Sequence, residues 1–325
     1  MRKHGIKLVL GYTVEGFKEK DNGVEILLKD NPSLQSDMVV LAIGVTPDTA
    51  LAKEAGLELG IKRSIVVNDR METSVPDIYA AGDAVQVKHY VTGDDALISL
   101  AGSANKQGRI IADNICGGDS RYLGSQGSSV IKVFDMTAAT TGINETNAKK
   151  SGLDVDTVIL SPMSHAGYYP GGKVMTMKVV FEKETYRLLG AQIIGYEGVD
   201  KRIDVLATAI HAGLKATQLK DLDLAYAPPY SSAKDPVNMA GFMIDNIAKG
   251  TLKQWHLEDM DKISKDNSVV LLDVRTVGEF NRGHMDGFKN IPVDELRERI
   301  NEIEKGKPVY LICQSGLRSY IASRI

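Results

Sequence analysis

Cysteine is scarce in this chain, with Cys116 and Cys313 the only two among 325 residues. Two cysteines cannot build a disulfide framework, and their spacing matches no zinc site, so we expect no bound metal. The longest apolar runs, such as 38–44, are far too short to cross a bilayer. No apolar core follows the basic residues in 1–10, so a secretory signal is not expected. These absences favour a cytoplasmic protein without a membrane partner.

An excess of charge of one sign is also missing. The 39 basic and 42 acidic residues leave a net charge of −3, and without a basic face nucleic acid is not an expected partner. Hydrophobic residues make up 43% and charged residues 25%, which is typical of globular proteins and excludes a disordered chain, a collagen-like repeat and a coiled coil. The length suggests about two domains of ~150 residues.

Short apolar runs separated by turn residues predict an α/β arrangement in the first 120 residues. The continuous run at 38–43 is typical of a strand buried on both faces of a sheet. Gly56 and Gly117 lie where helices are expected to end. Besides 38–43, the expected elements are strands over 7–12, 23–29, 65–67 and 77–81, a polar turn over 31–36, and helices over 48–56 and 97–116.

The middle and the end of the chain have different patterns. Five strand-like runs bounded by turns predict an antiparallel sheet followed by helices, which is an α+β domain. These strands are expected over 128–134, 137–141, 156–161, 174–181 and 187–194, with helices over 200–213 and 235–249. The helix at 200–213 carries a stripe of Ile203, Ala207, Ile210 and His211. In the last region, the sequence pattern predicts strands over 268–274 and 308–312 and helices over 293–304 and 319–325.

A glycine–aspartate pair follows the predicted strand at 77–81. The end of a strand is where α/β folds bind ligands. There Gly82 would let a ligand approach the backbone, and the carboxylate of Asp83 would accept hydrogen bonds from vicinal hydroxyls. On the pair alone, an ordinary strand–turn–helix with a capping aspartate is the better interpretation.

The longer stretch of sequence around this pair favours ligand binding instead. Residues 73–83 resemble the second FAD motif of the pyridine nucleotide–disulfide reductase family, in which the aspartate contacts the ribityl chain of the flavin. Residues 40–48 resemble the apolar strand and Gly-x-x-Pro turn that link the NAD and FAD domains of that family. The resemblance implies FAD and NAD(P)H as cofactors, with Ala81, Gly82 and Asp83 at the flavin.

Two turn-rich strings, 165–172 and 225–235, contain tyrosines. A tyrosine O–H is a good donor to a thiolate or a developing anion, although an aromatic ring beside proline can simply pack in a corner. Both strings resemble those of coenzyme A-disulfide reductases and their NADH oxidase and persulfide reductase relatives. There, the second string belongs to the dimerisation domain and reaches the partner subunit's active site. The resemblance implies coenzyme A as a substrate, a homodimer through 125–248, and Tyr168 with Tyr226, or alternatively Tyr230, as site residues.

Cys313 opens a six-residue loop between a predicted strand and a predicted helix. Loop amides and the helix N-terminus converge on its sulfur, and Arg318 adds a positive charge, so we expect a lowered thiol pKa. A buried structural cysteine is the alternative, but Gly316 and Arg318 in a polar loop argue against burial. Cys116, which lies between a helix and a Gly-Gly pair, is interpreted as structural.

The sequence around Cys313 resembles the rhodanese signature, and Cys-x-x-Gly-x-Arg is the active-site loop of that family. The segments that carry the resemblance in order and spacing are 271–280, 283–288 and 290–292. The resemblance implies that Cys313 carries sulfur as a persulfide with the support of Arg318. It implies structural roles for Asp273, Arg275 and His284.

We therefore expect a multidomain α/β and α+β chain. Its expected parts are the end of an NAD(P)-binding domain (1–60), the end of an FAD-binding domain (61–120), an α+β dimerisation domain (125–248) and an incomplete, rhodanese-like doubly wound α/β domain (254–325).

No Gly-x-Gly-x-x-Gly motif occurs, and no cysteine precedes Asp83, so the chain resembles an internal slice of the family. The expected function is an FAD- and NAD(P)H-dependent reductase of coenzyme A disulfides or persulfides with a rhodanese sulfur carrier. A stand-alone sulfurtransferase acting through Cys313 and a non-catalytic dimerisation module remain open.

Overall fold

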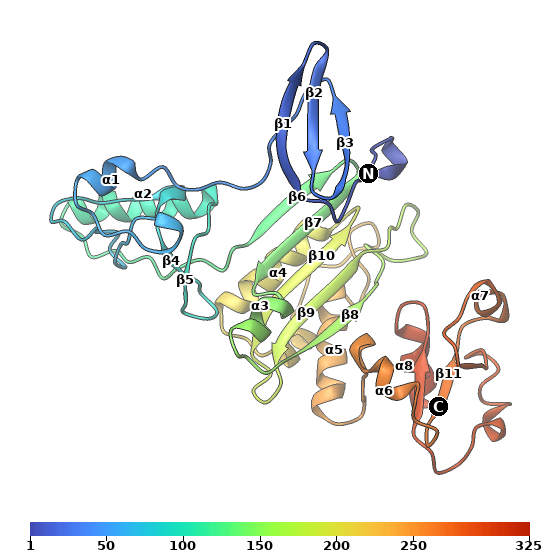
Figure 1. Cartoon of the computed structure of the whole chain (residues 1–325). Helices are drawn as coiled ribbons and strands as arrows, with labels where there is room; N and C mark the ends of the chain where they lie inside the picture. The colour runs from blue at the N-terminus through green and yellow to red at the C-terminus, as the bar shows by residue number, and fades with distance from the viewer. The chain divides into compact units, whose positions relative to one another are not determined.

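The computed structural model describes residues 1–325 and divides into two units (Figure 1). The first unit comprises Met1–Gln86 and Ala104–Arg121, and the second comprises Val87–Ser103 and Tyr122–Ile325. None of the helices combines the length and the apolar composition needed to span a bilayer.

The first unit contains a three-stranded antiparallel meander. Its strands are β1 (Val14–Lys20), β2 (Gly23–Leu28) and β3 (Asn31–Ser36), preceded by the 3-10 turn η1 (Arg2–His4). The strand predicted at 23–29 is confirmed, whereas the strand at 7–12 and the turn at 31–36 are wrong. The polar segment 31–36 forms an edge strand because a strand needs only backbone pairing, here with Ile26 opposite Leu34.

The strand predicted over 38–43 is also wrong, because this segment forms no regular structure. Its side chains are exposed apart from the half-buried Val39, and Ile43 reaches 88%. A strand buried on both faces needs a neighbouring strand on each side and cover above and below. No strand of the chain pairs with this segment, so its apolar side chains face outward. The strands predicted at 65–67 and 77–81 are reduced to isolated bridges, at Ile65 and Tyr79.

The two helices predicted in this part are confirmed as α1 (Ala50–Glu54) and α2 (Ala101–Ile115). Gly56 has a φ of +79°, as expected at a helix end. Within the first unit, Gln107 of α2 is buried and accepts a hydrogen bond from the N–H of Gly82 at 2.8 Å. The short elements between them are η2 (Ile61–Arg63), η3 (Gly82–Ala84), β4 (Val87–Lys88) and β5 (Asp95–Ala96).

The second unit is built on a five-stranded antiparallel sheet of order β6-β7-β10-β9-β8, which confirms the five predicted strands. The strands are β6 (Ser129–Val133), β7 (Met136–Gly142), β8 (Val155–Leu160), β9 (Thr176–Glu182) and β10 (Leu188–Gly195). Helices α4 (Val199–His211) and α5 (Pro236–Ala248), also predicted, lie along the sheet in Figure 1. The short elements α3 (Glu145–Lys150) and η4 (Ala216–Asp221) complete this part.

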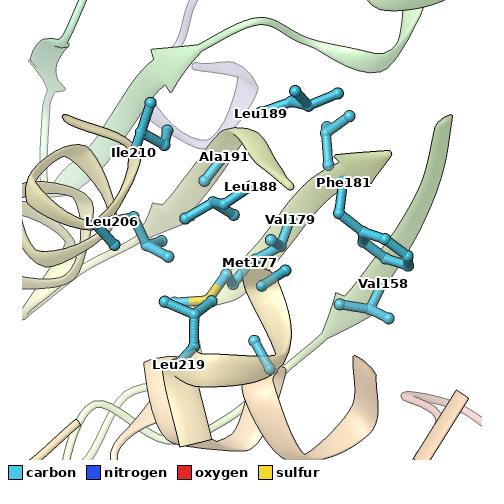
Figure 2. Close-up of a cluster of buried hydrophobic side chains, with 14 of the residues drawn as sticks. Val158, Met177, Val179, Phe181, Leu188, Leu189, Ala191, Leu206, Ile210 and Leu219 are labelled. Carbon is cyan, nitrogen blue, oxygen red and sulfur yellow. The ribbon is translucent and has the colours of Figure 1, made fainter. Parts of the chain in front are cut away.

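The main hydrophobic core lies between this sheet and the helices. Figure 2 shows Leu206 and Ile210 of α4 and Leu219 of η4 beside side chains from the strands, including Met177 and Val179. Within the predicted stripe on α4, Ile203 and Ile210 belong to this core. Ala207 is only partly buried and His211 is exposed, so the stripe mostly packs inward.

The last region is a three-stranded parallel sheet of order β12-β11-β13. Its elements are η5 (Leu257–Asp259), α6 (Met260–Ile263), β11 (Val270–Asp273), α7 (Val277–Arg282), β12 (Lys289–Asn290), η6 (Ile300–Glu302), β13 (Val309–Ile312) and α8 (Leu317–Arg324). The helix predicted over 293–304 is wrong, since turns and η6 occupy that range. A helix is stabilised mainly by burying an apolar face, and here Leu296 is buried while Ile300 is exposed.

Candidate functional site

The sulfur of Cys313 lies in a cradle of hydrogen-bond donors. Strand β13 ends at Ile312, and Gly316 adopts a left-handed conformation, φ +92°, that turns the chain into α8. The backbone N–H groups of Gly316 and Ser319 point at Sγ from 3.1 and 3.4 Å, and the hydroxyl oxygen of Ser319 lies 3.5 Å away. Short loops of this kind, leading into a helix, concentrate N–H dipoles on one atom and favour an anion there.

These donors change the acidity of Cys313. Partial burial raises the thiol pKa, but the Ser319 hydroxyl and the loop amides outweigh it, so the pKa is lowered overall. The direction agrees with the prediction from sequence. Because the thiolate is the reactive form of cysteine, the loop is suited to nucleophilic sulfur chemistry.

Arg318 interacts electrostatically with the Cys313 sulfur, which helps raise the pKa of the guanidinium, but its hydrogen bonds go to a carboxylate. Its two terminal nitrogens donate to the carboxylate of Glu279 at 2.7 and 2.8 Å. This pairing, reinforced by hydrogen bonds from Thr276, holds the pKa of Glu279 far below its usual range. The positive charge of Arg318 is therefore matched by a negative one, and the backbone N–H groups of Gly316 and Ser319 are the donors to the Cys313 sulfur.

Glu279 is thus a residue that sequence reasoning missed. The available signal was the pattern Thr276-x-x-Glu279, a capping box that starts α7 and orients the carboxylate. The structural roles expected nearby are present, because Arg275 donates to the buried carboxylate of Asp273 and to the carbonyl of Gly283.

Two further predictions have different outcomes. His284 stacks on Phe280 with ring centroids 3.8 Å apart, and it also hydrogen-bonds the carbonyl of that residue, consistent with a structural role. The structural interpretation of Cys116 is not supported by burial, because its side chain is exposed beyond the end of α2.

The structure brings Tyr168 and Tyr226 together. Their hydroxyl oxygens are 2.7 Å apart, although the two side chains are 76% and 45% exposed. The hydrogen bond between the two hydroxyls raises the pKa of Tyr226. Tyr230 is 72% exposed and its hydroxyl has no such partner, so the geometry separates two tyrosines that the sequence could not distinguish.

A cavity of about 430 Å³ adjoins this tyrosine pair. Tyr226 and Tyr230 form part of its wall, together with His165 and Lys201. In a pair of hydroxyls, one O–H donates to the other oxygen, which leaves the second O–H free to donate to a ligand. The pair therefore offers a neutral proton donor beside a space that can admit a small substrate group.

The Gly82–Asp83 turn fits the approach of a hydroxyl-bearing ligand. Gly82 has a φ of +85°, and a side chain there would meet nothing closer than the Cβ of Ala104 at 3.9 Å. Ala81 and Asp83 are exposed, and the Asp83 carboxylate makes no hydrogen bond or ion pair within the chain. An open backbone beside an uncommitted carboxylate is the donor and acceptor set that a ribityl chain requires.

Comparison with known proteins accounts for all three regions. A family model for pyridine nucleotide-disulphide oxidoreductases matches residues 1–108, and the dimerisation-domain model of the same family matches 128–236. The chain belongs to the pyridine nucleotide-disulphide oxidoreductase family. Residues 256–325 match the rhodanese-like domain model, and the mixed α/β architecture is the one expected from the sequence.

Several relatives show what this chain is similar to. It is 39% identical over 214 residues to an NAD(P)H sulfur oxidoreductase (CoA-dependent) of Pyrococcus furiosus, covering 66% of this chain and 48% of that protein. It is 37% identical over 223 residues to a coenzyme A disulfide reductase of Staphylococcus aureus, covering 68% and 50%. The chain thus spans about half the length of these relatives.

A solved structure resembles the whole chain. The structure of reduced Bacillus anthracis CoADR-RHD is 46% identical and superposes with a TM-score of 0.94. The match covers 99% of this chain and 58% of the other. It therefore includes the region that carries Cys313 as well as the two loops that carry the tyrosine pair.

Proposed function

We propose that this chain belongs to an FAD- and NAD(P)H-dependent reductase of coenzyme A disulfides or persulfides, in which Cys313 carries sulfur. The observation that carries the proposal is the cradle of neutral donors around the Cys313 sulfur, with Gly316 N–H at 3.1 Å. The reactions named for the relatives, coenzyme A disulfide reduction and CoA-dependent sulfur reduction, support the same substrate class.

The proposed parts keep the boundaries expected from sequence. Residues 1–60 belong to an NAD(P)-binding domain, 61–120 to an FAD-binding domain, 125–248 to a dimerisation domain and 254–325 to a rhodanese-like domain. A homodimer through 125–248 would be isologous, since each copy offers the same surface to the other. The match of 128–236 to a dimerisation-domain model supports this assembly.

Ala81, Gly82 and Asp83 are the proposed flavin contacts in this chain. When bound, the flavin supplies two-electron transfer from NAD(P)H to a sulfur substrate. Asp83 would accept hydrogen bonds from ribityl hydroxyls, and the absence of a side chain at Gly82 would leave the backbone accessible. The overall reaction for a persulfide is balanced as CoA–S–S⁻ plus NAD(P)H giving CoA–S⁻, HS⁻ and NAD(P)⁺.

Cys313 is the proposed sulfur carrier. Its thiolate attacks the outer sulfur of a donor such as thiosulfate, the S–S bond of the donor breaks, and sulfite leaves while Cys313 becomes a persulfide. A thiolate acceptor, for which coenzyme A is the proposed candidate, then attacks the outer sulfur and regenerates the Cys313 thiolate. The amides of the loop stabilise the anionic sulfur in both states.

Tyr168 and Tyr226 are the proposed proton donors. Cleavage of a coenzyme A disulfide or persulfide releases a thiolate or hydrosulfide anion, and a neutral O–H can stabilise that charge as it develops. Because the pKa of Tyr226 is raised, its hydroxyl stays protonated throughout the neutral range.

The sulfur-transfer part is tested with thiosulfate as donor and cyanide as acceptor, followed by mass spectrometry of the loaded protein. We expect Cys313→Ser to abolish thiocyanate formation and the one-sulfur mass increase, and Cys116→Ser to change neither. Activity that survives Cys313→Ser would contradict the carrier role.

The reductase part is tested by NAD(P)H oxidation with coenzyme A disulfide and with coenzyme A persulfide, using flavin-loaded protein. Tyr168→Phe and Tyr226→Phe should each slow turnover without changing flavin content. Sulfur transfer without NAD(P)H oxidation would favour a stand-alone sulfurtransferase, and the absence of both activities would favour a dimerisation module.

A further inference from the structure

The residues around the same cavity include a fully buried arginine that the proposed reaction does not use. Arg202, on α4, is 1% exposed and faces the buried carboxylate of Asp235. Its Nε and Nη2 donate to that carboxylate at 3.2 and 2.9 Å, and Nη2 also donates to the hydroxyl of Ser231 at 3.0 Å. The Ser231 hydroxyl donates in turn to Asp235 at 2.7 Å, so the three side chains form a closed network.

The guanidinium also binds the backbone of two separate loops. Nη2 donates to the carbonyl of Ser164 at 3.0 Å and to that of Tyr230 at 3.3 Å. Ser164 lies four residues before Tyr168 in the loop between β8 and β9, and Tyr230 lies four residues after Tyr226 in the loop between η4 and α5. One planar side chain with five donors thus joins the two segments from which the paired tyrosines project.

Other contacts show that the site is built around this guanidinium. Nη1 donates to the carbonyl of Gly198 at 3.2 Å, and a Cβ on Gly198 would lie 2.1 Å from that nitrogen. Only glycine permits this approach, and its φ of +67° favours glycine as well. Asp235 serves a second purpose, because its carboxylate caps α5 by accepting the N–H of Val237 at 3.0 Å.

A buried ion pair is weak evidence for stability, since its desolvation cost can equal its electrostatic gain. The more specific consequence of the Arg202 contacts is that the two tyrosine loops are held in a fixed geometry. Two exposed tyrosine side chains lose rotamer freedom when their hydroxyls meet, and they do so readily only if their loops are already held. The loops contain no helix or strand, and their direct link is the N–H of Ala166 donating to the carbonyl of Ser231 at 2.9 Å.

We propose that Arg202 is a positioning residue that holds the loops of Tyr168 and Tyr226 so that their hydroxyls meet beside the cavity. Any catalytic consequence rests on the proposed function, whereas the positioning itself does not. The hydrogen bond between the tyrosines supplies a direct readout, because it raises the pKa of Tyr226.

The test follows the titration of each tyrosine by NMR in the 325-residue chain labelled with ¹³C at tyrosine Cζ. Tyr226 is assigned from Tyr226→Phe, and Tyr168→Phe gives the midpoint of Tyr226 without its partner. We expect the midpoint of Tyr226 in Arg202→Met to fall to the value found in Tyr168→Phe.

Two controls separate positioning from general stability. Lys220→Met removes the cation of another ion pair to α5, with Asp245 at 2.7 Å, and should leave the Tyr226 midpoint unchanged. Arg202→Lys keeps a cation for Asp235 but cannot reach the same set of carbonyls, so it should still lower the midpoint.

Circular dichroism identifies which variants are folded. If Arg202→Met does not fold, Arg202→Lys and Ser231→Ala decide the proposal by the same titration. A Tyr226 midpoint equal to that of the unmodified chain in a folded Arg202 variant would overturn it. The titration uses no substrate, so it stays decisive even if the chain proves to have no reductase activity.

Discussion

The hydroxyl of Ser319 should contribute measurably to the acidity of Cys313. It lies 3.5 Å from Sγ and 2.9 Å from the carbonyl of Gly316, so its one proton has two competing acceptors and turns toward the sulfur when the thiolate forms. Ser319→Ala removes this hydroxyl while leaving the backbone N–H groups of residues 316 and 319 in place. A hydrogen bond to a charged group contributes about 1.5–3 kcal/mol, and the long distance places this one at the lower end. Losing about 1.5 kcal/mol reduces the thiolate population about tenfold at a pH below the thiol pKa. Ser319→Ala should therefore raise the pKa of Cys313.

The assay is the rate of iodoacetamide alkylation against pH in a Cys116→Ser background, where Cys313 is the only thiol. The midpoint of the profile is the quantity to compare, because intrinsic nucleophilicity increases as the pKa of a thiol rises. Ser323→Ala is the matched control on the same helix, since that hydroxyl donates to the carbonyl of Tyr320 at 2.7 Å. An unchanged midpoint in folded Ser319→Ala, or an equal shift in Ser323→Ala, would refute the contribution of the Ser319 hydroxyl to the acidity of Cys313.

Three further predictions use other parts of the chain. Glu279→Gln should lower the pKa of the loop thiol further, because the guanidinium of Arg318 loses its carboxylate partner; the same alkylation profile checks this. The hydrogen bond to Asp156 raises the pKa of His256, so this contact stabilises the fold fully below pH ~6.5 and loses its effect as pH rises through the folded-state pKa. Melting temperatures of the unmodified chain and His256→Gln should therefore converge at alkaline pH, and a constant difference would contradict this. Gly142→Ala places a Cβ 2.1 Å from a backbone oxygen at a φ of +67°, and should lower the free energy of unfolding by about 2–5 kcal/mol in urea titrations.

The fold was predictable where the hydrophobic pattern of a strand and its pairing with nearby strands both follow from neighbouring sequence. The five-stranded antiparallel sheet follows from short apolar runs separated by turns, because each such strand pairs with others through short connections or one crossover. The segment at 38–43 has an equally clear pattern, but a buried parallel strand depends on neighbours that apolar content cannot supply. The turn predicted at 31–36 was wrong for the opposite reason, since the edge strand β3 forms by backbone pairing that tolerates its polar composition.

The candidate site shows the same division between local and distant information. The Cys313 loop was recognised because its donors lie within six positions of the cysteine in the sequence. Glu279 lies 39 residues from the arginine that it neutralises, and spacing alone does not bring the two together. The choice of Tyr226 over Tyr230 depends on how two irregular loops meet, which residues distant in sequence decide.

Both proposed sites use neutral donors toward sulfur and keep their guanidinium groups paired with carboxylates. Arg318 is paired with Glu279, and Arg202 is paired with Asp235, while N–H and O–H groups face Cys313 and the cavity. Neutral donors fixed by the fold stabilise an anion over short distances, and mobile ions screen such contacts less than the field of an exposed charge. The alkylation midpoint of Cys313 should therefore change little between low and high salt. A midpoint that rises steeply with salt would mean that an unpaired cation, rather than the donor cradle, governs the thiolate.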